Sequence, residues 1–150
     1  ILNRGTSGVL ALSGDDNYPY AVPVSYAYDG YKLYFHCAKS GHKIDAIRRN
    51  AKASFCVIDQ DLVVPEEYTS YFRSIIAFGT IRILEDSQEK REAIEKLAVK
   101  YAPDDNDAHR QAAIDRDWVP LCMLEMTIEH MTGKEAKELI KEKQQRNKSC

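Results

Sequence analysis

Large and small side chains alternate along residues 20–28, which is the most regular pattern in the chain. The large positions, every second residue from Tyr20 to Tyr28, predict one bulky strand face. The opposite face is predicted to carry the small side chains of Ala21, Pro23, Ser25 and Ala27. Pro23 cannot donate to a strand ladder, so it belongs at an edge or a bulge. The small face leaves room for a flat ligand or for a second packed sheet, and this strand alone does not separate the two.

Asp29-Gly30 follows this strand and is typical of a two-residue hairpin turn. We therefore expect residues 31–38 to form the next strand and to run antiparallel beside residues 20–28. Four further apolar runs predict strands at residues 7–12, 53–59, 71–84 and 121–130. The third of these is expected to bend near Gly79, and residues 60–70 are expected to form a loop.

Other segments have helical periodicity. A helix is predicted to open at Ser87 and to end before Pro103, and the polar segment 104–117 has the character of a short helix. From Lys134 onward the chain is highly charged, with an apolar stripe limited to Ala136, Leu139 and Ile140, so we expect a helix that frays into a disordered tail. Hairpin-linked strands with a few helices favour a small antiparallel barrel over a doubly wound parallel sheet.

The start of the helix after residues 31–38 has an unusual charge pattern. Ser40 is a suitable N-cap, the apolar face begins at Ile44, and Asn50 is a suitable stop. Lys43 stands where a capping box would have Glu or Gln, and a cation there opposes the helix dipole. A bound phosphate would reverse that penalty, with Gly41 allowing it to approach the backbone. The alternative is a solvated turn in which the lysines fall by chance.

Composition narrows the possible functions. With 150 residues and 44% hydrophobic residues, the chain has the length of one domain, of which we expect residues 1–133 to form the body and residues 134–150 a C-terminal helix and tail. A net charge of −2, without interleaved basic and aromatic residues, predicts no nucleic-acid partner. No apolar run has the length of a membrane span and no signal peptide opens the chain, so we expect a cytoplasmic protein without a membrane partner. Because residue 1 is Ile, we expect some N-terminal sequence to be missing.

The cysteines and histidines do not have the spacing of a metal site. Cys37, Cys56, Cys122 and Cys150 lack the paired short spacings of zinc ligands, and we interpret them as free thiols, with Cys56 and Cys122 in strands. His36, Cys37 and His42 lack a fourth ligand at a sensible spacing, so we expect no metal. The chain also lacks the glycine-rich signatures of dinucleotide-binding and P-loop folds.

Several ordered motifs together resemble the flavin-binding split-barrel proteins of the pyridoxamine-phosphate-oxidase-like superfamily, nearest to the nitroimidazole-resistance (Nim-type) branch. The similarity spans nearly the whole chain. It is carried by the segments that begin at Gly8, Pro19, Tyr34, Ser54, Tyr71 and Thr132.

This resemblance implies a six-stranded antiparallel split barrel, a homodimer with two FMN sites at its interface, and a small-molecule substrate; FAD is an alternative cofactor. It implies a flavin phosphate at Ser40, Gly41, His42 and Lys43. It also implies a flavin ring along Pro23, Val24, Ser25 and Tyr26, beside His36, Cys37 and Ala38. On the fifth strand, Tyr71, Arg73, Ser74 and Ile75 are expected near the ring or the interface. Trp118 is expected either to cover the ring from the other subunit or to pack in a corner of the core.

The expected function is an FMN-dependent oxidoreductase, in the Nim-type sense a reductase of nitroaromatic compounds, with an unknown natural substrate. His36 would deliver a proton to the acceptor, although a structural histidine is the alternative. A haem-binding or haem-degrading protein, with His36 or His42 as axial ligand, and a non-catalytic flavin store or sensor are the other candidates. We do not expect pyridoxamine-phosphate oxidase activity itself, because no cluster of arginines and histidines is present for a second phosphate.

Overall fold

The structure is a computed structural model that describes residues 1–148, apart from the side chains of residues 142 and 146–148. Its strands are β1 (Ser7–Ser13), β2 (Pro19–Ser25), β3 (Ala27–Tyr28), β4 (Lys32–Ala38), β5 (Lys52–Val64), β6 (Thr69–Leu84) and β7 (Leu121–Glu135). Its α-helices are α1 (His42–Arg49), α2 (Ser87–Tyr101), α3 (Asp107–Arg116) and α4 (Lys137–Lys148), and the short 3-10 helices η1 (Asp15–Asn17) and η2 (Pro65–Glu67) lie in turns. None of the helices in this described part is long and apolar enough to cross a membrane.

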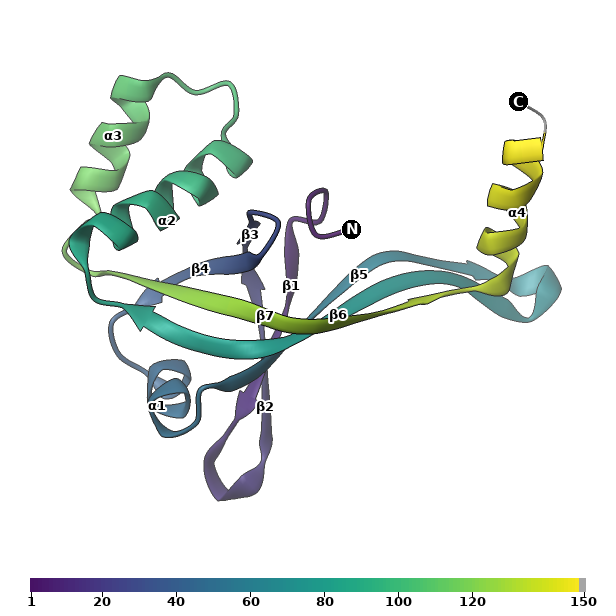
Figure 1. Cartoon of the computed structure of the whole chain (residues 1–150), viewed down its shortest axis with the longest axis horizontal. Coiled ribbons are helices and arrows are strands. Elements are labelled where there is room, and N and C mark those ends of the chain that lie inside the picture. The colour runs from purple at the N-terminus through teal and green to yellow at the C-terminus, as the bar shows by residue number, and fades with distance from the viewer. Residues whose placement is uncertain (149–150) are drawn as a thin grey trace.

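The strands form one antiparallel sheet in the order β2-β1-β5-β6-β7-β4-β3. Its two edge strands, β2 and β3, are separated along the chain by Tyr26 alone, so the sheet must curl until its edges meet at that residue (Figure 1). This arrangement confirms the predicted split-barrel fold, in which the edges approach each other without joining into a ladder. The predicted six strands become seven because residues 20–28 are divided.

The division at Tyr26 also corrects the predicted hairpin. Only β3 pairs with β4, with Ala27 opposite Tyr34, whereas β2 pairs with β1 along its whole length. The reason is the Tyr26 side chain, which is fully buried, meets the Phe55 ring edge to face and donates a hydrogen bond of 2.8 Å to the Leu2 carbonyl. Anchoring this residue in the core makes the strand turn from one edge of the sheet to the other.

The core lies inside the curl of the sheet. Phe35 of β4 and Phe55 of β5 pack edge to face at 5.1 Å, and Leu10, Leu33 and Leu124 are completely buried around them. A second, smaller apolar cluster lies on the outer face, where α2 covers β3, β4 and β7 through Ala93 and Leu97. The outer face therefore divides into a part covered by α2 and an open part along β2 and the end of β4.

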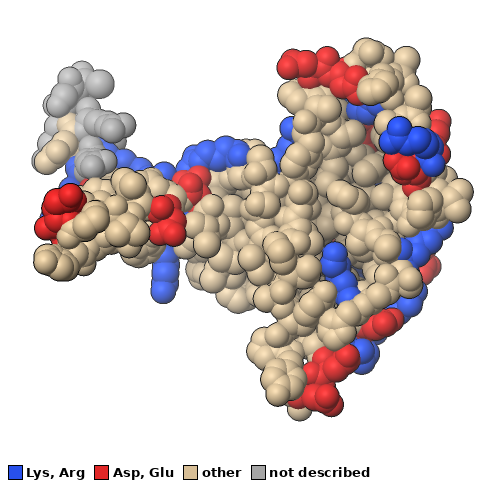
Figure 2. Space-filling model, turned by 180° about the vertical axis from the view of Figure 1, so that it is seen from behind, with Lys and Arg blue, Asp and Glu red and all other residues tan. Residues whose placement is uncertain are grey.

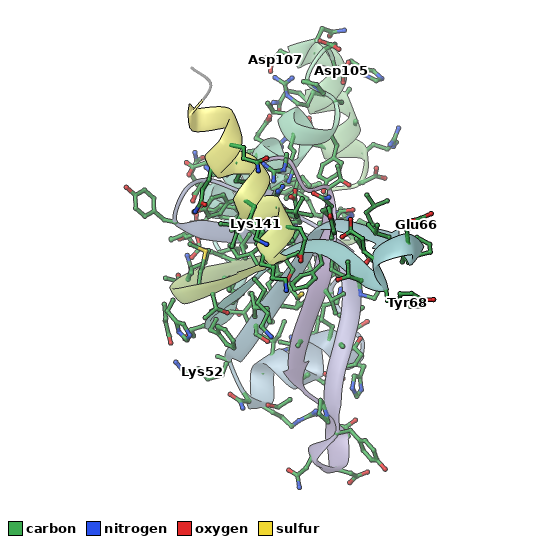
Figure 3. The ribbon with its side chains drawn as sticks, turned by 90° about the vertical axis from the view of Figure 1, so that its right-hand side faces the viewer. Lys52, Glu66, Tyr68, Asp105, Asp107 and Lys141 are labelled. Atoms are coloured by element: carbon green, nitrogen blue, oxygen red, sulfur yellow. The ribbon has the colours of Figure 1, made fainter. Side chains whose placement is uncertain are left out.

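The predicted loop over residues 60–70 is wrong. β5 continues to Val64 across an irregular pairing between Ile58 and Gln60, and β6 begins at Thr69, so the two strands form a long projecting arm that turns at Pro65–Glu67. Figure 3 shows Glu66 and Tyr68 at the tip of this arm. Polar residues and Pro65 conceal the strand pattern in the sequence, but the neighbouring strand satisfies the backbone.

Several predicted boundaries are confirmed. α1 stops before Asn50, α2 runs from Ser87 to Tyr101, and β6 is irregular at Phe78/Gly79. β7 is longer than predicted and extends to Glu135, which Arg73 of β6 holds at 2.5 Å. The helix expected after Lys134 is α4, which lies at the outer end of the arm (Figure 1). The tail expected at its end lies partly outside the described residues.

Candidate functional site

The open outer face of β2 carries small side chains. Ala21, Pro23 and Ser25 are exposed, while Tyr20, Val22 and Val24 turn toward the core, as the alternation predicts. Within the described residues of this chain all strands belong to one sheet, and no second sheet packs on this face. The face offers a shallow, largely apolar strip of backbone.

This strip connects two features of the structure. At its beginning the Tyr20 ring meets the His42 ring edge to face, with centroids 4.3 Å apart, so the start of α1 lies beside the start of β2. At its end Ser25 and His36 line the same cavity. Exposed Ala38, the last residue of β4, lies between His36 and the turn into α1. The structure therefore brings Pro23, Ser25, His36, Ala38 and the α1 start to one side of the barrel.

The start of α1 differs in detail from the prediction. Gly41, not Ser40, is the N-cap, and no side chain caps the helix. Gly41 has φ 122° and ψ 170°, a conformation essentially limited to glycine, and this turn leaves the Ser40 hydroxyl unused as a cap. The first amides of α1 thus lie at the surface without a capping oxygen, as an anion site requires.

The basic side chains at this turn are in different situations. His42 lies 3.3 Å from the Asp15 carboxylate, which also holds Arg49 at 2.6 Å. Lys43 is half-buried and has no ion-pair partner among the described residues. Lys43 is therefore available to a phosphate at this helix start, whereas His42 already faces a carboxylate.

A cavity of about 430 Å³ lies between this side of the barrel and the helix pair α2–α3. Ser25, His36 and Leu121 form its floor, and Ile94, Ala98 and Ile114 are among the apolar residues of its wall. Its volume is within the range of small-molecule sites in proteins. The apolar stripe of α2 gave a signal for a buried face, but sequence reasoning missed that α2 and α3 would wall a pocket beside His36.

Cys37 faces the interior of the barrel and lies directly opposite Cys122 in the β4–β7 ladder. Burial, and the neighbouring Cys122, raise the pKa of Cys37 to about 12, while Lys43 acts in the opposite direction. Cys37 is consequently a neutral thiol near neutral pH, and only its backbone could face a ligand. Cys37, Cys56 and Cys122 are free, with Cys56 and Cys122 in strands as predicted; Cys150 lies outside the described residues.

Other candidate residues are placed elsewhere or turn inward. Val24 and Tyr26 point to the core, so only their main chains border the open strip. Ser74 lines a separate open pocket on the arm, and Ile75 packs against the core of this chain. The structure of this chain does not bring Ser74 or Ile75 to the cavity that His36 lines.

Trp118 packs against α2 of the same chain. The Lys90 Nζ atom lies 4.1 Å from its ring centroid, the Arg91 Cζ atom lies 4.6 Å away, and Lys90 also donates to the Trp118 carbonyl at 3.0 Å. Trp118 is half-buried and lies outside both hydrophobic clusters, so it packs against basic side chains of α2 and not in a corner of the core. Over the residues that the structure describes, no three His, Cys, Asp or Glu side chains gather as metal ligands would.

Comparison with known proteins gives the same fold. A protein from Bacteroides thetaiotaomicron, provisionally assigned as a 5-nitroimidazole antibiotic resistance protein, is 22% identical with a TM-score of 0.72 and is matched over 89% of this chain and 78% of its own. An FAD and heme binding protein from Mycobacterium smegmatis is 19% identical with a TM-score of 0.71, over 90% and 67%. An FAD-binding protein from Mesorhizobium loti is 23% identical with a TM-score of 0.62, over 89% and 86%.

At these identities the solved structures show the fold alone. No curated protein matches the chain. The family model described as pyridoxamine 5'-phosphate oxidase, however, matches residues 1–135, which is nearly the whole length. The chain belongs to the pyridoxamine 5'-phosphate oxidase family.

Proposed function

We propose that this protein binds a flavin, specifically FMN, on the open strip of β2 and β4 and is a flavin-dependent oxidoreductase. One observation carries the proposal. An uncapped helix start with a free lysine and an apolar cavity containing a histidine lie at the two ends of one exposed strip of small residues. A flavin has the matching order of parts, with a phosphate at one end and a flat redox-active ring at the other.

The residues present fit such a ligand. Ala21, Pro23 and Ser25 leave the main chain of β2 accessible, and a Cβ atom added at Gly41 would meet nothing within 4 Å. Lys43 and the α1 amides would hold the phosphate, since charge-assisted bonds at a helix start are favourable for anions. FMN fits this helix start better than FAD, because the phosphate of FMN is terminal whereas the phosphates of FAD lie in the middle of the molecule.

Bound flavin would supply electron transfer to an acceptor, so the protein itself needs to bind, orient and supply protons. His36 lies at the cavity floor and has no hydrogen-bond partner among the described residues. Its imidazole is therefore available to donate a proton to an acceptor in the cavity, which is a common role for histidine near neutral pH.

We propose nitroaromatic compounds as acceptors. Two electrons and two protons convert a nitro group to a nitroso group and water, which suits a flavin beside a proton donor. The structural neighbour from Bacteroides thetaiotaomicron, with its provisional 5-nitroimidazole resistance assignment, supports this choice. The physiological acceptor would share the flat, uncharged character of such compounds.

We also propose a homodimer with the flavin at its interface. The strip is open on one side in the single chain, and the β5–β6 arm exposes Ile58, Leu62 and Val63, with Val63 65% exposed. Figure 2 shows that charged side chains are sparse over the middle of the molecule's rear face. A second subunit would cover exposed apolar surface and bring Ser74 or Trp118 toward the partner's flavin.

Identification of the cofactor tests the proposal. The purified protein should be yellow, and heat or acid should release FMN that co-elutes with the authentic compound in chromatography. Dithionite reduction followed by anaerobic addition of a nitroaromatic acceptor should restore the oxidised flavin spectrum. A Soret band without flavin absorbance would instead favour the haem-binding alternative, and flavin that no acceptor reoxidises would favour a flavin store or sensor.

A further inference from the structure

The polar groups that line the cavity beneath α2 and α3 differ in whether they are free to form hydrogen bonds with a ligand. Its floor contributes the Ser25 hydroxyl and the His36 imidazole, and among the described residues neither has a hydrogen-bond partner. The wall contributes mainly aliphatic side chains, including Ile94, Ala98 and Ile114. A ligand in this space would therefore meet hydrogen-bond donors at one end only.

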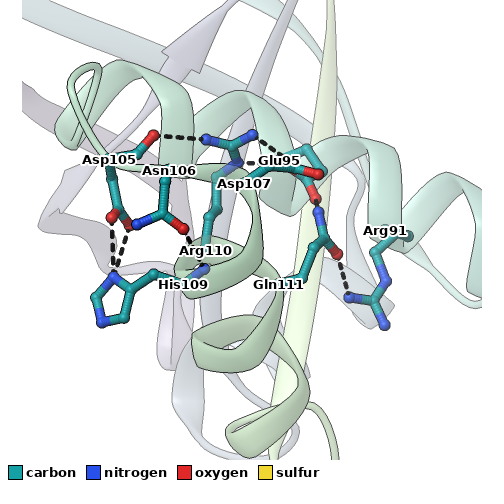
Figure 4. Close-up of polar contacts among 8 residues, drawn as sticks. All are labelled: Arg91, Glu95, Asp105, Asn106, Asp107, His109, Arg110 and Gln111. Atoms are coloured by element: carbon teal, nitrogen blue, oxygen red, sulfur yellow. Dashed lines mark hydrogen bonds and ion pairs between the residues drawn. The ribbon is translucent and has the colours of Figure 1, made fainter.

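The cation that lines the cavity is already neutralised. Arg110 donates from Nε to Glu95 at 3.0 Å, from Nη2 to Asp107 at 2.6 Å and from Nη1 to the Asp105 carbonyl at 3.3 Å (Figure 4). Its guanidinium is mostly buried by these contacts. Since each of its three guanidinium nitrogens already donates a hydrogen bond, Arg110 is not free to bind a phosphate or carboxylate in a bidentate manner.

The Tyr101 hydroxyl is also engaged by groups of the protein itself. Its hydroxyl accepts a hydrogen bond from the Tyr26 amide at 3.0 Å and lies within hydrogen-bond distance of the Thr6 and Tyr26 carbonyls. The two carboxylates at the cavity are paired as well, Asp105 with the His109 Nδ1 atom at 2.9 Å and Asp117 with Arg116 at 2.9 Å. Among the described residues, an anionic ligand in this cavity would therefore lose its hydration without meeting an unpaired lysine or arginine.

The helix pair that forms the wall is held together on its outer side. Arg91 of α2 donates to Gln111 of α3 at 3.1 Å, and Gln111 in turn donates to Glu95 (Figure 4). Arg91 also reaches Asp115 of α3 at 2.5 Å. These bridges fix α3 on α2 and leave their apolar inner faces toward His36. The cavity is thus a formed part of the fold with a defined wall.

We infer that this cavity is the acceptor pocket and that it selects small, uncharged aromatic acceptors whose hydrogen-bond-accepting group points to His36 and Ser25. This inference rests on the proposed flavin site, which the cavity adjoins, and adds the class of substrate. Phosphorylated or carboxylated acceptors are excluded by the chemistry of the wall. Ala98 is then a specificity-determining position, because a larger side chain there would occupy the space of the ligand's body.

Two matched nitroaromatic probes test the inference. 4-Nitrobenzyl alcohol and 4-nitrobenzoate differ mainly in charge, and their binding to the purified, cofactor-containing protein is measured by calorimetry. We expect the alcohol to bind at least about tenfold more tightly, since burial of an unpaired charge is costly. Equal binding, or tighter binding of the carboxylate, would overturn the inference.

Substitutions in the cavity wall test whether the alcohol binds in this cavity. Ala98→Leu should weaken binding of the alcohol about tenfold, whereas Val99→Leu, on the same helix but 49% exposed and outside the cavity, should leave it unchanged. Ala113→Leu narrows the same cavity from α3 and serves if Ala98→Leu does not fold. Unchanged affinity in a folded Ala98→Leu or Ala113→Leu protein would show that the cavity is not the pocket.

The binding results also separate this inference from the proposed function. If the protein carries no flavin, the proposed function fails and the inference, which rests on it, is overturned as a statement about an acceptor. If flavin is present and is reoxidised by the alcohol at equal rates in wild type and Ala98→Leu, the proposed function stands and the pocket assignment is wrong.

Discussion

The Asp15 carboxylate lies 3.3 Å from the Nδ1 atom of His42, and this contact ties the β1–β2 turn to the start of α1. His42, one of the candidate phosphate ligands, therefore already faces an acidic partner. Lys43, the next residue, has no such partner in the described part of the chain. The Asp15–His42 contact therefore distinguishes His42 from Lys43, although both are basic residues at adjacent positions in the sequence.

Replacement of Lys43 and Ser40 by alanine is expected to weaken FMN binding roughly 10- to 100-fold, because hydrogen bonds to charged groups contribute about 1.5–3 kcal/mol. Riboflavin, which lacks the phosphate, should be affected much less. Titration of the apo-protein with both ligands measures the difference, and His42→Ala is the matched comparison with a smaller expected loss. Equal losses for FMN and riboflavin would place the phosphate elsewhere.

His36→Ala should keep FMN bound and reducible by dithionite while slowing single-turnover reoxidation by a nitroaromatic acceptor. Positioned proton donation typically contributes on the order of 10²–10⁴-fold in rate. Reoxidation by oxygen, which needs no positioned substrate, should change less and serves as the control in stopped-flow measurements. An unchanged nitroaromatic rate would make His36 structural, and loss of FMN would make it a binding residue.

The exposed side chains of the β5–β6 arm provide a test of assembly. Val63→Asp should dissociate the dimer and weaken flavin binding together, because a charge would be placed in the proposed interface. Val99→Asp, at an exposed position of α2, is the control and should leave both unchanged. Sedimentation and flavin titration at sub-micromolar protein measure the two properties, and a monomer that binds FMN tightly would contradict the dimer.

Asp59 provides a prediction on acid stability. Hydrogen bonds from Arg4 and Arg73 lower its pKa to about 2 from an ordinary value near 3.8. Its ionised form therefore stabilises the fold above about pH 3.8, and this contribution is lost as the pH falls toward 2. Thermal melting between pH 5 and 2 should show a steeper loss in the wild type than in Asp59→Asn, which lacks this contribution throughout. Parallel curves would mean that Asp59 does not contribute.

Two glycines of the long strands form a matched pair for a packing test. A Cβ atom at Gly79 would lie 1.9 Å from the Thr127 carbonyl oxygen, whereas at Gly133 the nearest atom is 3.8 Å away. Gly79→Ala should therefore destabilise the protein by at least about 2 kcal/mol, and Gly133→Ala by less than about 0.5 kcal/mol. Urea unfolding of both variants measures the difference; similar midpoints would show that the backbone at Gly79 can relax.

The sequence alone determined the antiparallel fold class, the helix from Ser87 to Tyr101, and the small face of residues 20–28. Each of these depends on local periodicity or turn chemistry, which short-range sterics and burial impose along the chain. The motifs that resemble the family also identified the start of α1 and His36 as candidate positions before the fold was known.

Only the tertiary structure decided which strand edge each half of residues 20–28 would join, because burial of Tyr26 against Phe55 involves partners distant in sequence. The same is true of the arm, where strand pairing overrides the loop signal of residues 60–70. The cavity beside His36 and the commitment of Arg110 to Glu95 also depend on how α2 and α3 pack against each other and the barrel. Periodicity assigns a residue to a face, but the availability of its charge or hydroxyl depends on contacts that form only when distant segments meet.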